Sequence, residues 1–359
     1  MTASSSPRST SSATVVAPSA VHADATWAAP PAVATTMPSS SPARSMDRGT
    51  IRGATLPCMA TAVHPKRASL PLPGGSDGAG VTVTPMRTAD MLTQPRFFQR
   101  PSGPLATARG LGLLTPKSKW TWVPVPCFLV EHPTAGHFLI DTGLPPAASH
   151  DVRAALGRRA AMVYDIRMED GWAVTDRLVA LGLDPLGIEL VVLTHMHQDH
   201  VGAVAQLPRA TFVVDAREWE AATSSGFLHG YRRQLYDHDY DWRALDFGAA
   251  NVGSFASFGH AIDLFDDGSV RLLSTPGHTK GHTSVLLRLR SGRELLLTGD
   301  AAYSRATIDQ ELVPLFCDDV HRYQRSLREI RRYLEQTPTA EVVCGHDPES
   351  WPQVRERYE

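Results

Sequence analysis

Residues 188–200 read IELVVLTHMHQDH, and this stretch decides the fold. The apolar run from Ile188 to Leu193 predicts a short buried strand, and a His-x-His-x-Asp-His motif follows it directly. Four potential metal ligands lie within six residues: His195, His197, Asp199 and His200. Four ligands so close together cannot all reach one tetrahedral ion without crowding. Imidazole and carboxylate groups suit zinc, and also iron or manganese. We therefore expect two metal ions here rather than a histidine-rich surface loop.

Three downstream segments repeat this arrangement, each with an apolar strand that ends at a potential ligand. They are Val270–Leu273 before His278, Leu295–Leu297 before Asp300, and Glu341–Cys344 before His346. In layered α/β folds, functional groups collect beyond the carboxyl ends of strands. The sequence therefore predicts that these side chains join the first motif in one site.

Taken together, the motifs resemble the signature of the metallo-β-lactamase superfamily. They are, in chain order, Ile140-Asp141-Thr142-Gly143, the His195–His200 motif, Thr275-Pro276-Gly277-His278, Gly299-Asp300 and Gly345-His346. The resemblance covers about Val123 to His346. It implies an α/β fold in which two facing sheets are flanked by helices, the αββα sandwich.

Within that superfamily the chain is most similar to the N-acyl homoserine lactonases. The features that carry this narrower resemblance are Tyr303, Pro124–Asp141, Arg217–Ala222 and Gly345-His346-Asp347. The N-terminal extension and the long aromatic segment Ser224–His260 depart from the lactonase pattern. We expect that segment to shape the substrate pocket.

The resemblance also implies which residues hold the metals. It assigns His195, His197 and His278 to one ion. It assigns Asp199, His200 and His346 to the other ion, with Asp300 as a bridge. Two divalent ions, with Zn²⁺ as the first candidate, would share a hydroxide that opens the lactone ring of an N-acyl homoserine lactone.

Two side chains receive catalytic roles in this interpretation. The hydroxyl of Tyr303 would donate a hydrogen bond to the developing oxyanion or to the substrate. Asp199, or a water that it binds, would pass a proton to the leaving alkoxide. The alternative for Tyr303 is an aromatic residue of the core whose hydroxyl satisfies a backbone group.

Other candidates are assigned lesser roles. Asp141 is expected either to orient a ligand imidazole or to have a structural role at the end of its strand. His282 and His260 are expected to be structural, and alternation along its strand points Cys344 away from the ligands. Eight residues could line an acyl-chain pocket or a homodimer contact, although core packing is the simpler role for each: Trp120, Trp122, Phe128, Phe227, Leu228, Tyr231, Tyr236 and Tyr240.

Composition limits the partners and the cellular location that we expect for this protein. The formal net charge is −2, so bulk electrostatics give no reason to expect nucleic acid or an anionic membrane as a partner. The longest apolar runs are far shorter than the ~20 residues of a membrane span. The four cysteines show no Cys-x-x-Cys spacing, which favours free thiols in a reducing cytoplasm over a periplasmic or secreted protein. The expected partner is a small acylated lactone.

The N-terminal segment differs in composition from the rest of the chain. Of the first 45 residues, 34 are Ser, Thr, Ala or Pro. The remaining residues supply too few large apolar side chains to form a hydrophobic core. We expect residues 1 to about 80 to be disordered and residues 81–359 to form the hydrolase domain, so that a chain beginning near Val81 would still fold. A signal peptide with the apolar stretch Ala13–Val21, or a later start at Met46, Met59 or Met86, is the alternative.

Apolar periodicity predicts the elements of that domain. Strands are expected at Trp122–Glu131, His137–Asp141, Thr211–Asp215, Ala261–Phe265, Val270–Leu273, Ser284–Leu289, Glu294–Leu297 and Glu341–Cys344. Helices are expected at Val152–Leu156, at Thr175–Leu183, directly after the His195–His200 motif, and from a cap at Asp318 or Asp319 onward.

Other chemistries remain open for such a metal centre. The same fold and metals serve thioester, phosphodiester and β-lactam hydrolysis, because a fold does not determine a substrate. A mononuclear iron persulfide dioxygenase would need only part of the ligand set, and retention of all seven ligands argues against it. A scaffold with purely structural metals is the third alternative.

Overall fold

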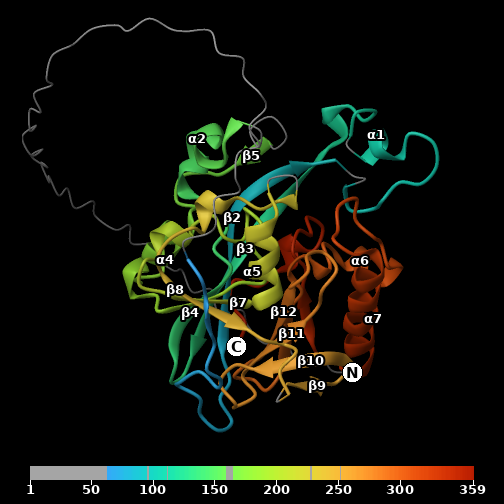
Figure 1. Ribbon diagram of the computed structural model, residues 1–359. Helices are drawn as coiled ribbons and strands as arrows, with labels where there is room; N and C mark the ends of the chain where they lie inside the picture. The colour runs from blue at the N-terminus through green and yellow to red at the C-terminus, as the bar shows by residue number, and fades with distance from the viewer. Residues whose placement is uncertain (1–62, 95–96, 111, 159–164, 227–228, 251) are drawn as a thin grey trace, which may run out of the picture. The chain divides into compact units, whose positions relative to one another are not determined.

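The structure is a computed structural model that describes residues 63–94, 97–110, 112–158, 165–226, 229–250 and 252–359. Two β-sheets face each other, with helices against their outer sides (Figure 1). This is the arrangement that the sequence predicts. The signal-peptide stretch and the alternative starts at Met46 and Met59 lie outside the described residues.

The first sheet has eight strands in the order β1-β8-β7-β6-β4-β3-β2-β5. Their bounds are β1 Lys66–Arg67, β2 Thr82–Thr93, β3 Thr121–His132, β4 Gly136–Ile140, β5 Asp165–Arg167, β6 Leu190–Val192, β7 Thr211–Asp215 and β8 Asp241–Leu245. The strands from β4 through β6, β7 and β8 to β1 pair in parallel, whereas β2, β3, β4 and β5 pair antiparallel. The strands expected at Trp122–Glu131 and His137–Asp141 are confirmed as β3 and β4, which form a hairpin.

The second sheet has six strands in the order β14-β13-β12-β11-β10-β9. Their bounds are β9 Gly253–Phe255, β10 Phe258–Asp263, β11 Val270–Ser274, β12 Thr283–Arg288, β13 Glu294–Leu297 and β14 Glu341–Val343. Only the pair of β13 with β14 is parallel.

Short helices connect the strands. They are α1 Ala106–Gly110, α2 Val152–Leu156, α4 Val174–Ala180, α5 Ala216–Ser224, α6 Arg305–Gln310 and α7 Val320–Gln336. Asp319 caps α7 by accepting a hydrogen bond from the backbone N–H of Arg322 at 3.0 Å, as predicted. The helix expected after the His195–His200 motif is wrong, because only a 3₁₀ turn, Val204–Gln206, forms there.

Alternation along the strands builds three apolar layers. On β12, Val285 and Leu287 pack between the two sheets, whereas Leu286 faces the helical side together with Leu327 of α7. A third cluster joins the outer face of the first sheet to α4 and α5. Two helix-to-sheet layers and one sheet-to-sheet layer account for the four-layer sandwich.

Strand β2 was not expected from the sequence. It pairs with β3 from Thr82↔Glu131 to Thr93↔Thr121 and includes Met86, so a chain that began at Met86 would lack the first part of this strand. Its interior carries a carboxylate, Asp90, which is fully buried and paired with Arg87 and Arg167. Charges and a proline, Pro85, hide the apolar pattern of this strand.

Residues 63–80 differ from the sequence-based expectation of disorder. The short strand β1 pairs with β8, and the backbone N–H of Leu72 donates to the carbonyl of Leu264 at 2.8 Å. Ala68, Leu70 and Leu72 pack against the core between the sheets. Edge pairing and local burial order a segment whose composition alone favours a flexible chain.

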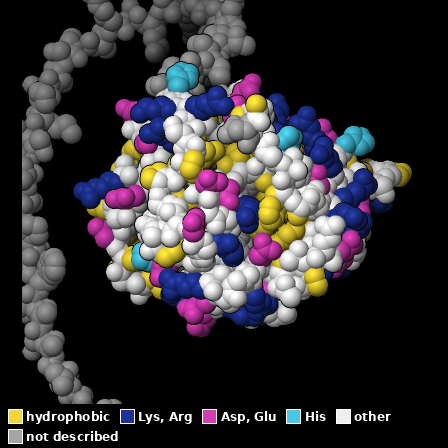
Figure 2. Space-filling view, turned by 90° about the horizontal axis from the view of Figure 1, so that it is seen from below, with side chains coloured by type: hydrophobic (Ala, Val, Ile, Leu, Met, Phe, Trp, Pro, Cys, Tyr) yellow, Lys and Arg dark blue, Asp and Glu magenta, His cyan; other side chains and the backbone are white. Residues whose placement is uncertain are grey.

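The surface carries no large field of one sign on the face that Figure 2 shows, where basic and acidic side chains are interspersed and apolar ones form small patches. None of the described helices is both long enough and apolar enough to cross a membrane.

Candidate metal centre

The seven side chains predicted as ligands meet at one place. Two groups form, each with donor atoms within 4.8 Å of one another: His195, His197, His278 and Asp300, and separately Asp199, His200 and His346. Each side chain stands just beyond the carboxyl end of a strand, namely β6, β11, β13 or β14. Both sheets therefore contribute to the cluster.

Asp300 lies between the two groups. Its Oδ2 is 3.3 Å from Nε2 of His278 and 3.8 Å from Nε2 of His195. Its Oδ1 is 3.3 Å from Nε2 of His346 and 3.4 Å from Nε2 of His200. Each carboxylate oxygen thus faces a different set of imidazoles.

Several metal-binding atoms at the centre are buried without a hydrogen bond. They are Nε2 of His195, Nε2 of His200 and Oδ1 of Asp300. Unpaired polar atoms are rare in protein interiors because each carries a desolvation cost. The two imidazole nitrogens lie 3.8 Å and 3.4 Å from the carboxylate oxygens of Asp300, and nitrogen and carboxylate donors in this arrangement fit divalent metal ions.

Hydrogen bonds on the far side of the imidazoles leave these nitrogens available. Nδ1 of His346 donates to the carbonyl of Pro124 at 2.8 Å, and Nδ1 of His200 lies 2.8 Å from Oδ2 of Asp141. The hydroxyl of Thr194 donates to Asp141 and lies 3.1 Å from Nδ1 of His195. In a neutral imidazole whose Nδ1 donates to such a partner, Nε2 carries the lone pair that can bind a metal ion. Asp141 therefore contacts a predicted ligand imidazole, as one of its two expected roles requires.

Burial and charge set the protonation of the cluster. Burial holds the pKa of His195 and of His278 well below the ordinary 6.5, so both are neutral donors. Burial also opposes a charge on His200, but the carboxylates of Asp141, Asp300 and Asp199 outweigh it and raise its pKa well above 6.5. The pKa of Asp300 is held well below 3.8 because neighbouring imidazoles outweigh its burial. An ionised carboxylate among imidazoles is a ready site for cations, which compete with the protons there.

Tyr303 lies against this cluster. Its hydroxyl is 3.2 Å from Nδ1 of His278, and its ring lies 5.6 Å from that of His346. Phe98 packs on the other side at 5.1 Å, and Phe97 lies 6.0 Å away. Phe316 stacks beside Phe97 and is 52% exposed. An apolar surface thus leads from the cluster to the outside.

The other histidines and Cys344 have no place among the ligands. Nε2 of His282 accepts the backbone N–H of Asp300 at 2.9 Å, so its lone pair is already used. His260 lies exposed on β10, outside both groups. Burial raises the pKa of Cys344 to about 12, which keeps this thiol protonated.

The eight residues proposed for a pocket or a dimer contact divide into three sets, of which the first, Trp120, Trp122 and Tyr240, is partly buried. Phe128, Tyr231 and Tyr236 are buried in the core, as the simpler expectation has it. Phe227 and Leu228 lie outside the described residues. The rings that connect Tyr303 to the exposed Phe316, namely Phe97 and Phe98, were missed because no sequence pattern connects them to the cluster.

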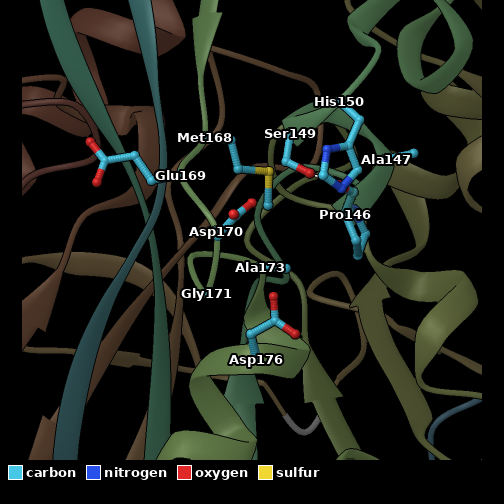
Figure 3. A pocket seen from close by; sticks show the side chains of 10 residues that line it. All are labelled: Pro146, Ala147, Ser149, His150, Met168, Glu169, Asp170, Gly171, Ala173 and Asp176. Carbon is cyan, nitrogen blue, oxygen red and sulfur yellow. Dashed lines mark hydrogen bonds between the residues drawn. The ribbon is translucent and has the colours of Figure 1, made fainter.

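A separate cavity of about 310 Å³ lies between the loop after β4 and the loop that leads into α4 (Figure 3). Its lining includes His150, Met168, Asp170 and Asp176, none of which belongs to the ligand groups. In Figure 3, Glu169 points away from the other labelled side chains. Nothing at this cavity resembles the orphaned donors of the cluster.

Comparison with known proteins places this geometry in a family. Residues 120–346 match the family model of the metallo-beta-lactamase superfamily. The N-acyl homoserine lactonase AttM of Azorhizobium caulinodans is 35% identical over 236 residues, which span 65% of this chain and 85% of AttM. AttM of Agrobacterium fabrum is 36% identical over 232 residues, 64% of this chain and 84% of that protein.

Solved structures share the fold. An N-acyl homoserine lactone hydrolase with the product N-hexanoyl-L-homoserine bound at its catalytic metal centre gives a TM-score of 0.62 at 20% identity, over 76% of this chain and 96% of that chain. AidC, a dizinc quorum-quenching lactonase in complex with a product, gives 0.52 at 15% identity, over 78% and 90% of the two chains.

The matched family model spans more than half of the chain, and the identity to AttM extends over most of that enzyme. The chain therefore belongs to the metallo-beta-lactamase superfamily and, within it, to the N-acyl homoserine lactonases. The predicted αββα fold and the predicted class of metal-dependent hydrolase are confirmed.

Proposed function

We propose that this enzyme opens the lactone ring of N-acyl homoserine lactones with two divalent ions, most simply Zn²⁺, at the cluster. The observation that carries the proposal is Asp300, whose two oxygens face two separate groups of imidazoles. Two cations close together need a shared anion, and a carboxylate in this position supplies one. The names and bound products of the relatives support the choice of substrate.

In this proposal the ligands divide as the two groups do. His195, His197 and His278 would hold one ion. Asp199, His200 and His346 would hold the other, and Asp300 would contribute to both sites. Divalent ions held in this way supply Lewis acidity and a hydroxide nucleophile at neutral pH.

Asp199 has a second task in the reaction. Its Oδ2 lies 3.5 Å from Nε2 of His346, and the side chain is nearly buried, with 7% of the residue exposed. A carboxylate at the rim of the cluster can take a proton and deliver it to the alkoxide that leaves when the ring opens. We assign this proton transfer to Asp199.

Tyr303 is the second side chain to which we assign a catalytic role. A phenol hydroxyl beside the cluster can donate to the oxygen on which negative charge develops. The same hydroxyl lies within hydrogen-bond reach of His278, so a role in holding that imidazole is also compatible with the geometry. Measuring metal content and kcat together separates the two roles.

The apolar surface next to Tyr303 suits the acyl chain of the substrate. Phe97, Phe98 and Phe316 pack edge to edge or tilted against one another and leave Phe316 half exposed. Contact with an alkyl chain would remove this surface from water, which stabilises the bound state by roughly 25 cal/mol per Å². We propose that these rings bind the acyl group.

Two broader assignments remain predictions. The cysteines of the described part, Cys127, Cys317 and Cys344, are free thiols, which supports a cytoplasmic location. A homodimer in which Trp120, Trp122 or Tyr240 contacts the second copy stays a prediction.

The test combines metal analysis with a substrate panel. Purified protein should contain about two zinc-like ions per chain, and the loaded enzyme should prefer an N-acyl homoserine lactone to thioesters, phosphodiesters and β-lactams. One iron per chain with oxygen consumption would instead favour the persulfide dioxygenase alternative. Two ions with preference for another ester would retain the metal centre and reject the lactone.

A further inference from the structure

Glu218 is a carboxylate buried beside the cluster, for which the proposed reaction has no use. It lies in the first turn of α5 and has no exposed surface. Its Oε1 accepts hydrogen bonds from the backbone N–H of Met196 at 3.0 Å and from the hydroxyl of Tyr231 at 3.1 Å. Its Oε2 accepts from the backbone N–H of Gly281 at 3.1 Å.

The two backbone donors belong to two different ligand loops. Met196 stands between His195 and His197, and Gly281 follows three residues after His278. One carboxylate therefore joins the loops that carry all three imidazoles of the first group. Sequence separation between these loops is about eighty residues, so this link is purely tertiary.

Both loops pack closely against Glu218 or against its partner Tyr231. A Cβ at Gly281 would come within 2.3 Å of the backbone nitrogen of Glu218, so the loop must approach α5 without a side chain there. Tyr231 forms a β-bridge with His197, and their rings lie 5.1 Å apart. Glu218 and Tyr231 thus support the first group together.

The imidazoles of the second group have other contacts on their outer sides. Asp141 contacts Nδ1 of His200, and the carbonyl of Pro124 accepts from Nδ1 of His346. The hydrogen bonds of Glu218 go instead to the backbone beside His195 and His197 and to the loop after His278.

We propose that Glu218 is a positioning residue that fixes the loop of His195 and His197 against the loop of His278, so that their imidazoles converge on one cation. The inference rests on the proposed division of the ligands between two ions. Burial of a carboxylate is unfavourable unless its hydrogen bonds are satisfied, and two of the three donors that offset this cost are the backbone N–H groups of the two loops.

The test is a Co²⁺ titration of metal-free protein followed by absorption spectroscopy and equilibrium dialysis. In Glu218→Gln an amide replaces one oxygen, and the amide NH₂ cannot accept the N–H that faces it. We expect one of the two Co²⁺ affinities to fall by about 10–100-fold, the usual effect of losing a residue that orients a ligand. The matched control is Glu220→Gln, an exposed glutamate on the same helix, which should bind two Co²⁺ as the wild type does.

Two backgrounds identify the affected group. With His346→Ala, which damages the second group, adding Glu218→Gln should weaken the remaining Co²⁺ by the same factor. With His278→Ala, which damages the first group, adding Glu218→Gln should leave the remaining affinity unchanged. Equal losses in both backgrounds would indicate general destabilisation and overturn the proposal.

Further outcomes are also decisive. Wild-type protein that binds fewer than two Co²⁺ would reject the proposed metal centre itself, before any variant is compared. If Glu218→Gln does not fold, Glu218→Asp replaces it, since the shorter side chain cannot reach both loops and should weaken the same site. Wild-type affinities in the folded variant, or loss of the fold in both variants, would overturn the positioning role.

Discussion

Asp300 connects the two ligand groups through its separate carboxylate oxygens, so one atom of this side chain belongs to each group. Replacing it with asparagine keeps the shape but removes the negative charge and one acceptor. We expect Asp300→Asn to lower metal affinity by more than the ~10–100-fold that follows loss of a residue bonded to a ligand. The metal content, measured by inductively coupled plasma analysis, and the rate of lactone hydrolysis should fall together. The control is Asp309→Asn, on the exposed side of α6.

The prediction for Asp300 fails if the variant retains two ions per chain and full turnover. In that case the two groups would be bridged by other means, and the assignment of Asp300 would be wrong.

Tyr303 offers a second test at this scale. Phenylalanine preserves the packing on Phe98 and removes only the oxygen near His278. If the hydroxyl stabilises developing charge, kcat should fall by about tenfold or more while metal content stays constant, less than the ~10²–10³-fold of a sole oxyanion donor. Loss of metal with the variant would instead assign the hydroxyl to holding His278. An unchanged kcat for the lactone would remove Tyr303 from the mechanism.

Single residues also show which parts of the site can be predicted from the sequence. The convergence of the seven side chains that we propose as ligands could be predicted because each follows an apolar strand, and strand ends converge in this kind of fold. The carbonyl of Pro124, which orients His346, could not be predicted, since every residue has a carbonyl. The link from Glu218 to two loops depends on how α5 packs, which no local pattern encodes.

Among the elements, α7 supports the loop of His278. The backbone N–H groups of Asp318 and Asp319 donate to the carbonyls of His278 and Gly277, both at 3.0 Å. The hydroxyl of Ser326 donates to the carbonyl of Pro276 at 2.8 Å. Contacts from α7 and from the two residues before it therefore hold the loop that carries His278 in place.

The cap of α7 can be tested directly. Asp319→Ala removes the acceptor for the N–H of Arg322 and should lower the melting temperature by about 2–4 °C at pH 7. That hydrogen bond holds the pKa of Asp319 below its ordinary 3.8. The ionised carboxylate therefore contributes its full stabilisation of the fold above pH 3.8. This stabilisation is lost as the pH falls through the lower pKa of the folded state.

The matched variant is Asp319→Asn, which caps without a charge. The difference between wild type and Asp319→Ala should shrink below about pH 4, whereas the difference between Asn and Ala should not. Scanning calorimetry across this range checks the assignment, and a pH-independent loss in the alanine variant would contradict it.

Elements with an uninterrupted apolar run, such as β7 and β13, could be predicted to the residue. Strand β2 could not, because its charges are neutralised only in three dimensions, where Asp90 meets Arg167 of β5. The helix predicted after the ligand motif is a 3₁₀ turn, since that segment packs closely and the N–H of Gly202 donates to the carbonyl of Gly143.

At the scale of the whole molecule, the described domain extends further toward the N-terminus than composition suggests. Arg288 donates to the carbonyl of Ala79, and the N–H of Val81 donates to the carbonyl of Arg288 at 2.8 Å. The segment from Val63 thus joins the second sheet as well as β8 of the first. We propose that the folded domain begins near Val63 rather than near residue 80.

Two truncated chains decide between these boundaries. A chain that begins at Val63 should unfold in urea at the same midpoint as the full chain. A chain that begins at Val81 loses β1 and the packing of Ala68, Leu70 and Leu72 between the sheets. Partial burial of two leucines is worth roughly 1 kcal/mol each, so its unfolding free energy should drop by about 2 kcal/mol or more. Because the ligand loops are untouched, both chains should still bind two Co²⁺ when folded. Equal midpoints for all three chains would show that residues 63–80 add no stability, and would restore the boundary near residue 80 that composition predicts.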